Sequence, residues 1–352
     1  MTQISDTKGA GGAAERSREH RGAAGTLVGF WARPASRAML ALLLVLLLGC
    51  LFNADGAFFK LGTHRDALRQ ASVFGILACG MTLVIVCGGI DLSVGSVLAL
   101  SAVSFSLMSI HWGWAPVVSV LLCLLLGAAC GALSGALTAS FRLQPFIATL
   151  AMMVFARGVA KTITGGMKVS TAVKNLDGTY RYVAVPDLFR FIDSRVLRGN
   201  VTVVSIIFLI GAVLAWLALS RHCWGRYLYA VGGNEEAARL SGVPVKLTKV
   251  LAYAASGLFA ATAGICQAAQ EQQGDPEAGI GYELTAIAIV VIGGTTLTGG
   301  RGGIGLTLLG TLTIGYLEKI LSINAVPEAT RLMLTGVIIV FAVLAQRRSS
   351  RT

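Results

Sequence analysis

The stretch TLVIVCGGIDLSVGSVLALSAV, residues 82–103, decides the fold. Nearly every residue in it is apolar or small, and the flanking uncharged segments reach the roughly 20 residues that span a bilayer core. Asp91 stands in its middle, two residues after the pair Gly88 and Gly89, which predicts a helix break. The stretch therefore predicts two membrane helices joined at a buried turn, with Asp91 as either a functional group or a structural one.

The composition of the whole chain agrees with a membrane protein. Of 352 residues, 55% are hydrophobic and 13% are charged, whereas soluble domains carry roughly 25% charged residues. The net charge of +12 lies mainly in the N-terminal tail, a few loops and the C-terminal QRRSSRT. This placement is typical of membrane topology and not of a nucleic-acid surface. The seven cysteines form no C-x-x-C pair, so neither a metal site nor a disulfide framework is predicted.

Apolar blocks separated by turn or charge signals predict an all-α, polytopic protein with about ten transmembrane helices. The expected spans are 38–53, 67–87, 92–110, 115–139, 145–165, 200–219, 249–270, 283–296, 303–321 and 329–346.

The domain organisation follows from these spans. Residues 1–37 are expected to be a disordered basic cytoplasmic tail, 38–346 the transmembrane domain, and 347–352 a cytoplasmic tail. With the N-terminus inside, residues 166–199 form an outer, periplasmic loop and 220–248 a cytoplasmic segment. The loop 166–199 fits this topology poorly because it carries six Lys or Arg residues, and a count of eight or nine spans would move it.

Two segments repeat one pattern. LVIVCGGIDLSVGSVLAL and AIVVIGGTTLTGGRGGIGL each run from an apolar segment through Gly-Gly and a small polar turn to another apolar segment. Paired glycine-interrupted segments favour a transporter with inverted-repeat-like organisation. Separately, Gly127, Gly131 and Gly135 form overlapping G-x-x-x-G steps, which predict close helix packing within the subunit or, alternatively, a dimer interface.

The sequence lacks the motifs of nucleotide hydrolysis, catalysis and metal binding. The chain has no Gly-Lys-Ser or Gly-Lys-Thr, so any nucleotide that drives it must be hydrolysed by another subunit. GRGGIG, residues 300–305, formally matches a dinucleotide fingerprint but has no βαβ context, and a glycine-rich turn explains it better. No catalytic residues and no metal ligands are predicted.

The segment 225–249 carries the signals of a short soluble helix. Asn234 is a good N-cap, Glu235 and Glu236 suit the first turn, and Gly242 marks the end. A helix this short needs a surface on which to pack. That surface is either the membrane end of the same chain or a partner protein that acts on it, and the local signals do not distinguish the two.

Four long stretches, in order, carry a resemblance: GMTLVIVCGGIDLSVGSVLAL, LQPFIATLAMMVFARGVAKTITGG, GRYLYAVGGNEEAARLSGV and GYELTAIAIVVIGGTTLTGGRGGIGLTLLGTL. They cover most of the chain from about residue 70, and they resemble the permease subunit of bacterial ATP-binding-cassette (ABC) monosaccharide importers, the family of ribose, xylose and galactose permeases.

The resemblance implies a multi-pass protein of the bacterial inner membrane that translocates a monosaccharide. Its implied partners are an ABC ATPase subunit, which uses the ATP and magnesium, a periplasmic sugar-binding protein and a second permease chain, identical or paralogous. No cofactor is expected on this chain itself. GGNEEAARLSG resembles the coupling segment that docks on the ATPase, and its residues are Asn234, Glu235, Glu236, Ala237, Ala238, Arg239, Leu240 and Gly242.

The chain departs from the family pattern at two places. Thr285 stands where relatives often carry an acid, and the loop 166–199 is longer and more basic than usual. The alternative is a related ABC importer permease for another small solute, such as a branched-chain amino acid or a signalling furanose. A secondary transporter and a non-transport membrane scaffold are the alternatives of other classes.

A neutral sugar needs a path of small polar and aromatic side chains. The candidates are Ser93, Ser96, Gln144, Phe146, Thr149, Thr295, Thr296 and Thr298, although Ser and Thr in membrane helices also bond to their own backbone. Arg157 lies inside a predicted span, where an arginine costs roughly 2.5–3.5 kcal/mol, so it is expected to pair with Asp91 or a helix end or to face water. For Gly88, Gly89 and Asp91 we expect a structural cap at a cytoplasmic-side turn, with a gate as the alternative.

Overall fold

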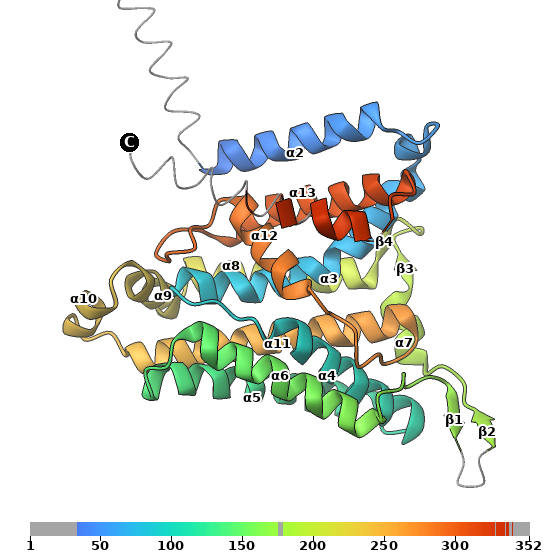
Figure 1. Ribbon diagram of the computed structural model, residues 1–352, viewed down its shortest axis with the longest axis horizontal. Coiled ribbons are helices and arrows are strands. Elements are labelled where there is room, and N and C mark those ends of the chain that lie inside the picture. The colour runs from blue at the N-terminus through green and yellow to red at the C-terminus, as the bar shows by residue number, and fades with distance from the viewer. Residues whose placement is uncertain (1–33, 175–178, 328, 335, 338–339, 341–352) are drawn as a thin grey trace, which may run out of the picture.

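Long helices run side by side through the molecule, with their axes nearly parallel (Figure 1). The computed structural model describes residues 34–174, 179–327, 329–334, 336–337 and 340. Most of the expected N-terminal tail, all of the C-terminal tail and much of the expected span 329–346 lie outside these residues. The prediction of an all-α polytopic fold is confirmed.

Eight helical segments in the described part of the chain are long and apolar enough to cross a membrane. They are α2 (Pro34–Leu51), α3 (Leu61–Val86), α4 (Val94–Ser106) with the π-helix η2 (Leu107–His111), α5 (Pro116–Ser140), α6 (Pro145–Thr164), α8 (Val203–Ser220), α11 (Val245–Glu271) and α13 (Ile304–Ile323). A ninth apolar helix, α12 (Tyr282–Gly293), has 12 residues, which at 1.5 Å per residue is too short to cross alone.

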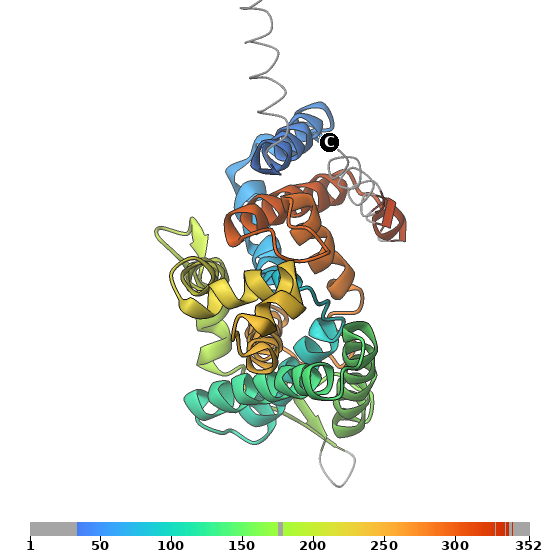
Figure 2. The ribbon, with the colours of Figure 1, turned by 90° about the vertical axis from the view of Figure 1, so that its left-hand side faces the viewer.

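The helices are stacked in layers from α2, through α13 and α3, to α11 and then α5 and α6 (Figure 2). The helices α3 and α4 are mostly buried, whereas α2, α5 and α6 turn large apolar faces outward. Such faces suit a lipid surround or a second protein. The fold therefore has a buried centre built from α3, α4 and α11.

The interface between α5 and α11 explains the G-x-x-x-G pattern. A side chain at Gly127 or Gly131 would overlap the backbone of Gly257 or Tyr253 on α11. These glycines let two helix backbones approach closely, as small residues do in membrane proteins. The prediction of packing within the subunit is confirmed at this interface.

Short elements occupy the two ends of the stack. At one end lie α9 (Cys223–Gly233) and α10 (Glu235–Leu240). The opposite end carries η1 (Ala57–Phe59), the hairpin β1–β2 (Ala172–Lys174, Tyr180–Tyr182), α7 (Asp187–Asp193) and the hairpin β3–β4 (Arg195–Val196, Val201–Thr202) (Figure 1). The segments 220–248 and 166–199 thus lie at opposite ends of the stack, as the expected topology requires.

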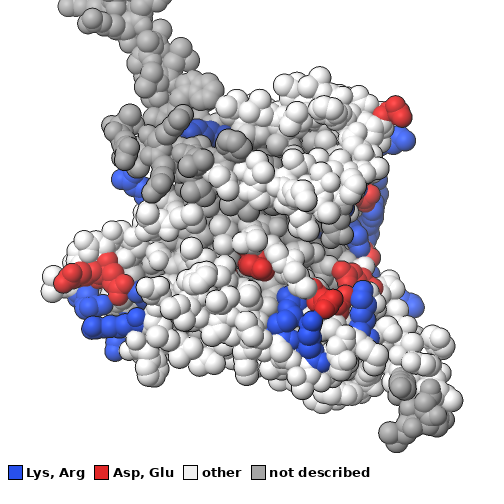
Figure 3. All heavy atoms as spheres, viewed as in Figure 1, with Lys and Arg blue, Asp and Glu red and all other residues white. Residues whose placement is uncertain are grey.

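Charged side chains gather mainly at these two ends, and much of the surface between them is uncharged (Figure 3). The loop 166–199 is anchored there by Phe189, which is buried and stacks on Phe105 of α4 at 4.6 Å between ring centroids. The described part of the loop is therefore packed on the helix bundle.

Ion pairs explain why this end tolerates a basic loop. The acidic segment between α11 and α12 supplies Asp275 to Lys168 at 2.9 Å and Glu277 to Lys161 at 2.9 Å. The hydrogen bond and the charge of Asp275 raise the pKa of the Lys168 ammonium. Because the positive loop and the acidic loop lie at the same end, their charges compensate each other.

Candidate functional site

The helix α10 is built by local signals. The Asn234 side chain caps it by accepting a hydrogen bond from the Ala237 N–H at 3.0 Å, as the N-cap rule predicts. At the other end Gly242 adopts φ +80°. The Val243 N–H bonds to the Ala238 carbonyl and the Gly242 N–H to the Arg239 carbonyl, which is a Schellman motif. The expected short helix is confirmed.

The residues expected to couple this chain to an ATPase divide into an inner and an outer set. Ala238 is buried against the chain itself, whereas Leu240 is 85% exposed. Glu235 binds Arg239 within α10 at 2.9 Å and Lys249 of α11 at 2.6 Å. The pair with Lys249 holds α10 against α11, and the pair with Arg239 stabilises α10 itself, so the outer residues of α10 have a fixed position.

The helix α9 was not expected from the sequence. His222 caps it, with its Nδ1 accepting a hydrogen bond from the Trp224 N–H at 3.2 Å. Tyr229 donates a hydrogen bond to the Gly302 carbonyl at 3.0 Å. The helix thereby connects α10 to the glycine-rich turn before α13.

The two glycine-rich turns that share a sequence pattern touch each other beside α9. The Gly300 N–H donates to the Val86 carbonyl at 2.9 Å, joining the turn before α13 to the end of α3. Gly232 of α9 lies against both partners, and a Cβ added to it would stand 2.7 Å from the Gly300 nitrogen and even closer to the Val86 oxygen. We call this contact of Gly232, Val86 and Gly300 the glycine joint. Sequence reasoning missed Gly232, although its signal was the Gly-Gly pair just before Asn234.

The segment 87–93 leads from the glycine joint into the bundle, where α4 begins (Figure 1). Asp91 is buried there, and Ser256 of α11 donates a hydrogen bond to its Oδ2 at 2.7 Å. Ser256 lies 11 residues after the start of α11, or about 16 Å along the helix. The carboxylate of Asp91 therefore lies well inside the bundle and not at the end of a helix, whereas the side of the membrane that this turn faces stays a prediction.

Asp91 also differs from the expected N-cap. Helix α4 has Ser93 as its N-cap, and Asp91 precedes that residue by two positions. Its Oδ1 nevertheless accepts the Ser93 N–H at 3.0 Å and the Ser93 hydroxyl at 2.6 Å, so one expected donor is met. Three donors satisfy the carboxylate, which is the condition for burying such a group. The structural interpretation of Asp91 is supported, with the turn and α11 as the parts that it joins.

Replacement of Asp91 separates its charge from its hydrogen bonds. Asp91→Asn keeps an oxygen for the Ser93 N–H, and the Ser256 hydroxyl can turn to accept from the amide. We expect this variant to insert and to transport nearly as wild type does. Asp91→Ala leaves buried donors unpaired at about 1–3 kcal/mol each, so we expect a lower unfolding temperature and little transport. Uptake lost in a stably folded Asp91→Asn protein would assign a function to the charge.

The eight candidates for the sugar path differ in their exposure. Ser93, Ser96, Thr149 and Thr295 are buried within the chain. Gln144, Phe146 and Thr298 are exposed, and Thr296 is half-buried. Two cavities of about 260 and 360 Å³ are lined by none of the eight.

The side-chain hydroxyls of two of these threonines form hydrogen bonds with backbone carbonyls of the chain. Thr149 donates to the Pro145 carbonyl of its own helix at 3.0 Å and approaches the Ile90 carbonyl at 3.3 Å. Thr296 lies within reach of the Gly299 and Arg301 carbonyls at 3.1 and 3.2 Å. Their hydroxyls therefore stabilise local backbone, whereas Gln144, Phe146 and Thr298 are the exposed candidates.

Arg157 is paired differently from the expectation that named Asp91. Its guanidinium donates to the Pro276 carbonyl at 2.6 Å and the Ala278 carbonyl at 2.7 Å, in the segment between α11 and α12. Backbone carbonyls thus satisfy the intramembrane arginine and fix α6 to that segment.

The chain is a membrane-spanning permease. Comparison with known proteins identifies its family. It belongs to the family of the branched-chain amino acid transport system / permease component, whose model matches residues 65–343.

Its relatives include the ribose import permease protein of Escherichia coli (strain K12), 40% identical over 319 residues, 89% of this chain and 93% of the relative. The fructose import permease protein of Bifidobacterium longum is 34% identical, over 89% of this chain and 90% of the relative. The galactofuranose transporter permease protein of Escherichia coli (strain K12) is 36% identical, over 88% of each chain. No solved structure matches the chain.

Proposed function

We propose that this chain is the permease subunit of an ABC importer and carries a monosaccharide inward across the bacterial inner membrane. Relatives that align over nearly nine tenths of the chain are named for the import of ribose, fructose and galactofuranose. The observation that carries the mechanism is the glycine joint, through which α9, the helix directly before α10, contacts the turns of both interrupted helix pairs.

The outer residues of α10 dock on the ATPase subunit, which binds the ATP and magnesium. ATP binding moves α10, and the ion pair of Glu235 with Lys249 makes α10 and the start of α11 move together. The motion reaches the Val86 and Gly300 turns through Gly232 and Tyr229. Nucleotide then shifts the permease between inward- and outward-facing states because it binds them with different affinity.

The two ends of the stack face opposite sides of the membrane. The α10 end is cytoplasmic, together with the N-terminus, and the end with α7 and both hairpins is periplasmic and receives the sugar-binding protein. A second permease chain packs on the outward face of α6, where Phe146, Val154 and Phe155 are each more than half exposed. Gln144 and Phe146 on this face are the path residues that the fold best supports.

The family name mentions branched-chain amino acids, so an amino-acid substrate is the second candidate. A sugar is favoured because the named relatives above are sugar permeases, and because Asp91 and Arg157 already have partners within the chain. A path without a free ion suits a neutral polyol better than a zwitterion.

Reconstitution of the full complex tests the function. We expect ATP hydrolysis by the permease and ATPase in proteoliposomes to rise severalfold with a sugar-loaded binding protein and to stay basal with the empty one. Stimulation by a leucine-loaded binding protein alone would support the amino-acid candidate. Solute uptake by the permease without any ATPase would instead show a secondary transporter.

A further inference from the structure

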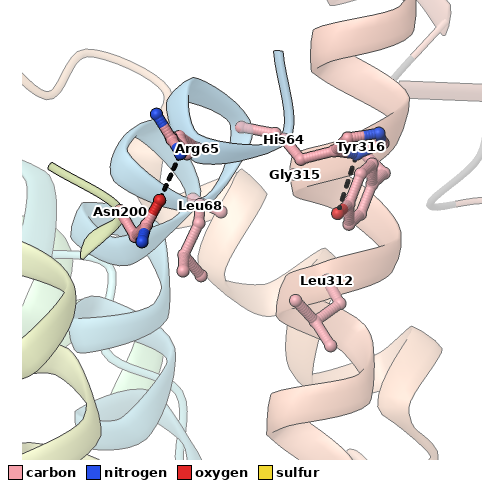
Figure 4. Close-up of a pocket in the computed structure, with 9 residues that line it drawn as sticks. His64, Arg65, Leu68, Asn200, Leu312, Gly315 and Tyr316 are labelled. Carbon is pink, nitrogen blue, oxygen red and sulfur yellow. Dashed lines mark hydrogen bonds between the residues drawn. The ribbon is translucent and has the colours of Figure 1, made fainter. Parts of the chain in front are cut away.

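A cavity of about 260 Å³ lies between α3 and α13 at the end of the stack opposite α10. Its walls include Leu68 and Ala71 of α3 and Leu312 of α13, and its rim carries Arg65, Asn200 and Tyr316. In Figure 4 the polar side chains occupy one end of the gap and the two leucines lie below them. The cavity is thus apolar in depth and polar at its rim.

The rim holds a cation without a carboxylate partner. The Arg65 guanidinium donates to the Asn200 side-chain oxygen (Figure 4). Its Nε is buried and has no acceptor within the described part of the chain. An arginine whose donors are only partly used is a ready partner for a phosphate or carboxylate oxygen.

The neighbouring acids are already engaged by other cations. Asp193 accepts from the Arg69 Nε at 2.9 Å. Asp66 binds Arg195 at 2.8 Å and lies 3.9 Å from Lys319. Arg69, Arg195 and Lys319 therefore share these two carboxylates. Together with Arg65 they form a cluster that carries a net positive charge beside the cavity.

Exposed apolar side chains lie at the same end of the stack as the rim. Phe59, Leu61 and Leu197 are each at least 60% exposed at this end of the stack, and Leu61 lies one helical turn before Arg65 on the same face of α3. Exposed apolar side chains beside a basic group at the end of a membrane helix are typical of the membrane interface.

We propose that this cavity binds an anionic phospholipid of the periplasmic-side leaflet. The lipid phosphate accepts hydrogen bonds from Arg65, and one acyl chain runs along Leu68 and Leu312. The cavity is smaller than the roughly 300–1,000 Å³ of sites that enclose a whole small molecule. It therefore holds part of a ligand whose remainder lies outside, as with a lipid between two helices.

Native mass spectrometry of the full-length permease, purified with its ATPase, tests this site. The probes are phosphatidylglycerol and phosphatidylcholine in equal amounts in mixed micelles. Both lipids carry a phosphate, but the choline ammonium of phosphatidylcholine is repelled by the positively charged cluster beside the cavity. We therefore expect phosphatidylglycerol to be retained at least about tenfold over phosphatidylcholine. Arg65→Gln should remove this preference, Arg65→Lys should keep part of it, and the control Arg181→Gln, an exposed residue of β2, should leave it unchanged.

A second variant tests the cavity apart from the charge. Leu312→Trp fills the groove while Arg65 remains, so the retained phosphatidylglycerol should fall in this protein too. Equal retention of the two lipids by wild type, or full retention by both variants, would overturn the proposal. Displacement of the lipid by free ribose would also overturn it, because the cavity would then be a sugar site.

Discussion

Replacing Gly232 with alanine is expected to reduce ATP-driven uptake at least about tenfold. The new methyl group would overlap the Val86 carbonyl and the Gly300 nitrogen, which are backbone atoms and cannot rotate away. The turns must separate, and the hydrogen bond between Gly300 and Val86 breaks. Overpacking and the lost bond together cost about 2–4 kcal/mol. The measurement is uptake in proteoliposomes, with thermal unfolding followed in parallel.

The adjacent glycine supplies the matched control. Gly233 lies in the same helix, and an added Cβ there would meet no atom within 4 Å. Gly233→Ala should therefore transport as wild type does. Both variants should still co-purify with the ATPase, because neither glycine belongs to the outer surface of α10. If Gly232→Ala transported as well as Gly233→Ala, the glycine joint would have no part in coupling.

Replacing Leu240 with aspartate is expected to weaken association with the ATPase at least about thirtyfold, which corresponds to the roughly 2 kcal/mol of a central interface residue. Leu240 is 85% exposed on α10, so its removal leaves the fold of this chain intact. An aspartate there would lose the apolar contact and place a charge in a dry interface. The measurement is the amount of ATPase that co-purifies with the permease.

Leu240→Met keeps the apolar contact and should retain the ATPase. Ala238 is a poor site for the same test, because it is buried within the chain and a larger side chain would displace α10 itself. Unchanged co-purification of Leu240→Asp, in protein that is correctly inserted, would contradict the docking assignment.

Local signals predicted the helices well. The expected span 145–165 is the helix Pro145–Thr164, and 115–139 is Pro116–Ser140. The caps of α10 were also predictable, because the bonds of Asn234 and Gly242 reach only three residues away. Hydrophobic length and capping act within a few turns of chain, so they can be recognised without the fold.

Contacts between distant segments could not be predicted in the same way. The hydrogen bond between Asp91 and Ser256 joins residues 165 positions apart, and the residues near Asp91 in the sequence do not predict this partner. The bonds of Arg157 to backbone carbonyls were equally hidden, since every residue offers a carbonyl. The role of helix α9 was missed because it depends on contacts with two turns that are distant in the sequence.

The sequence by itself therefore determined a bundle of membrane helices, interrupted at two glycine-rich turns, with a capped helix at one end. Only the tertiary structure decided that the two turns meet at Gly232 and that Asp91 lies inside the bundle. The physical reason is the range of the forces involved. Hydrophobic length, glycine and caps act locally, whereas the partner of a buried carboxylate depends on which helices pack together.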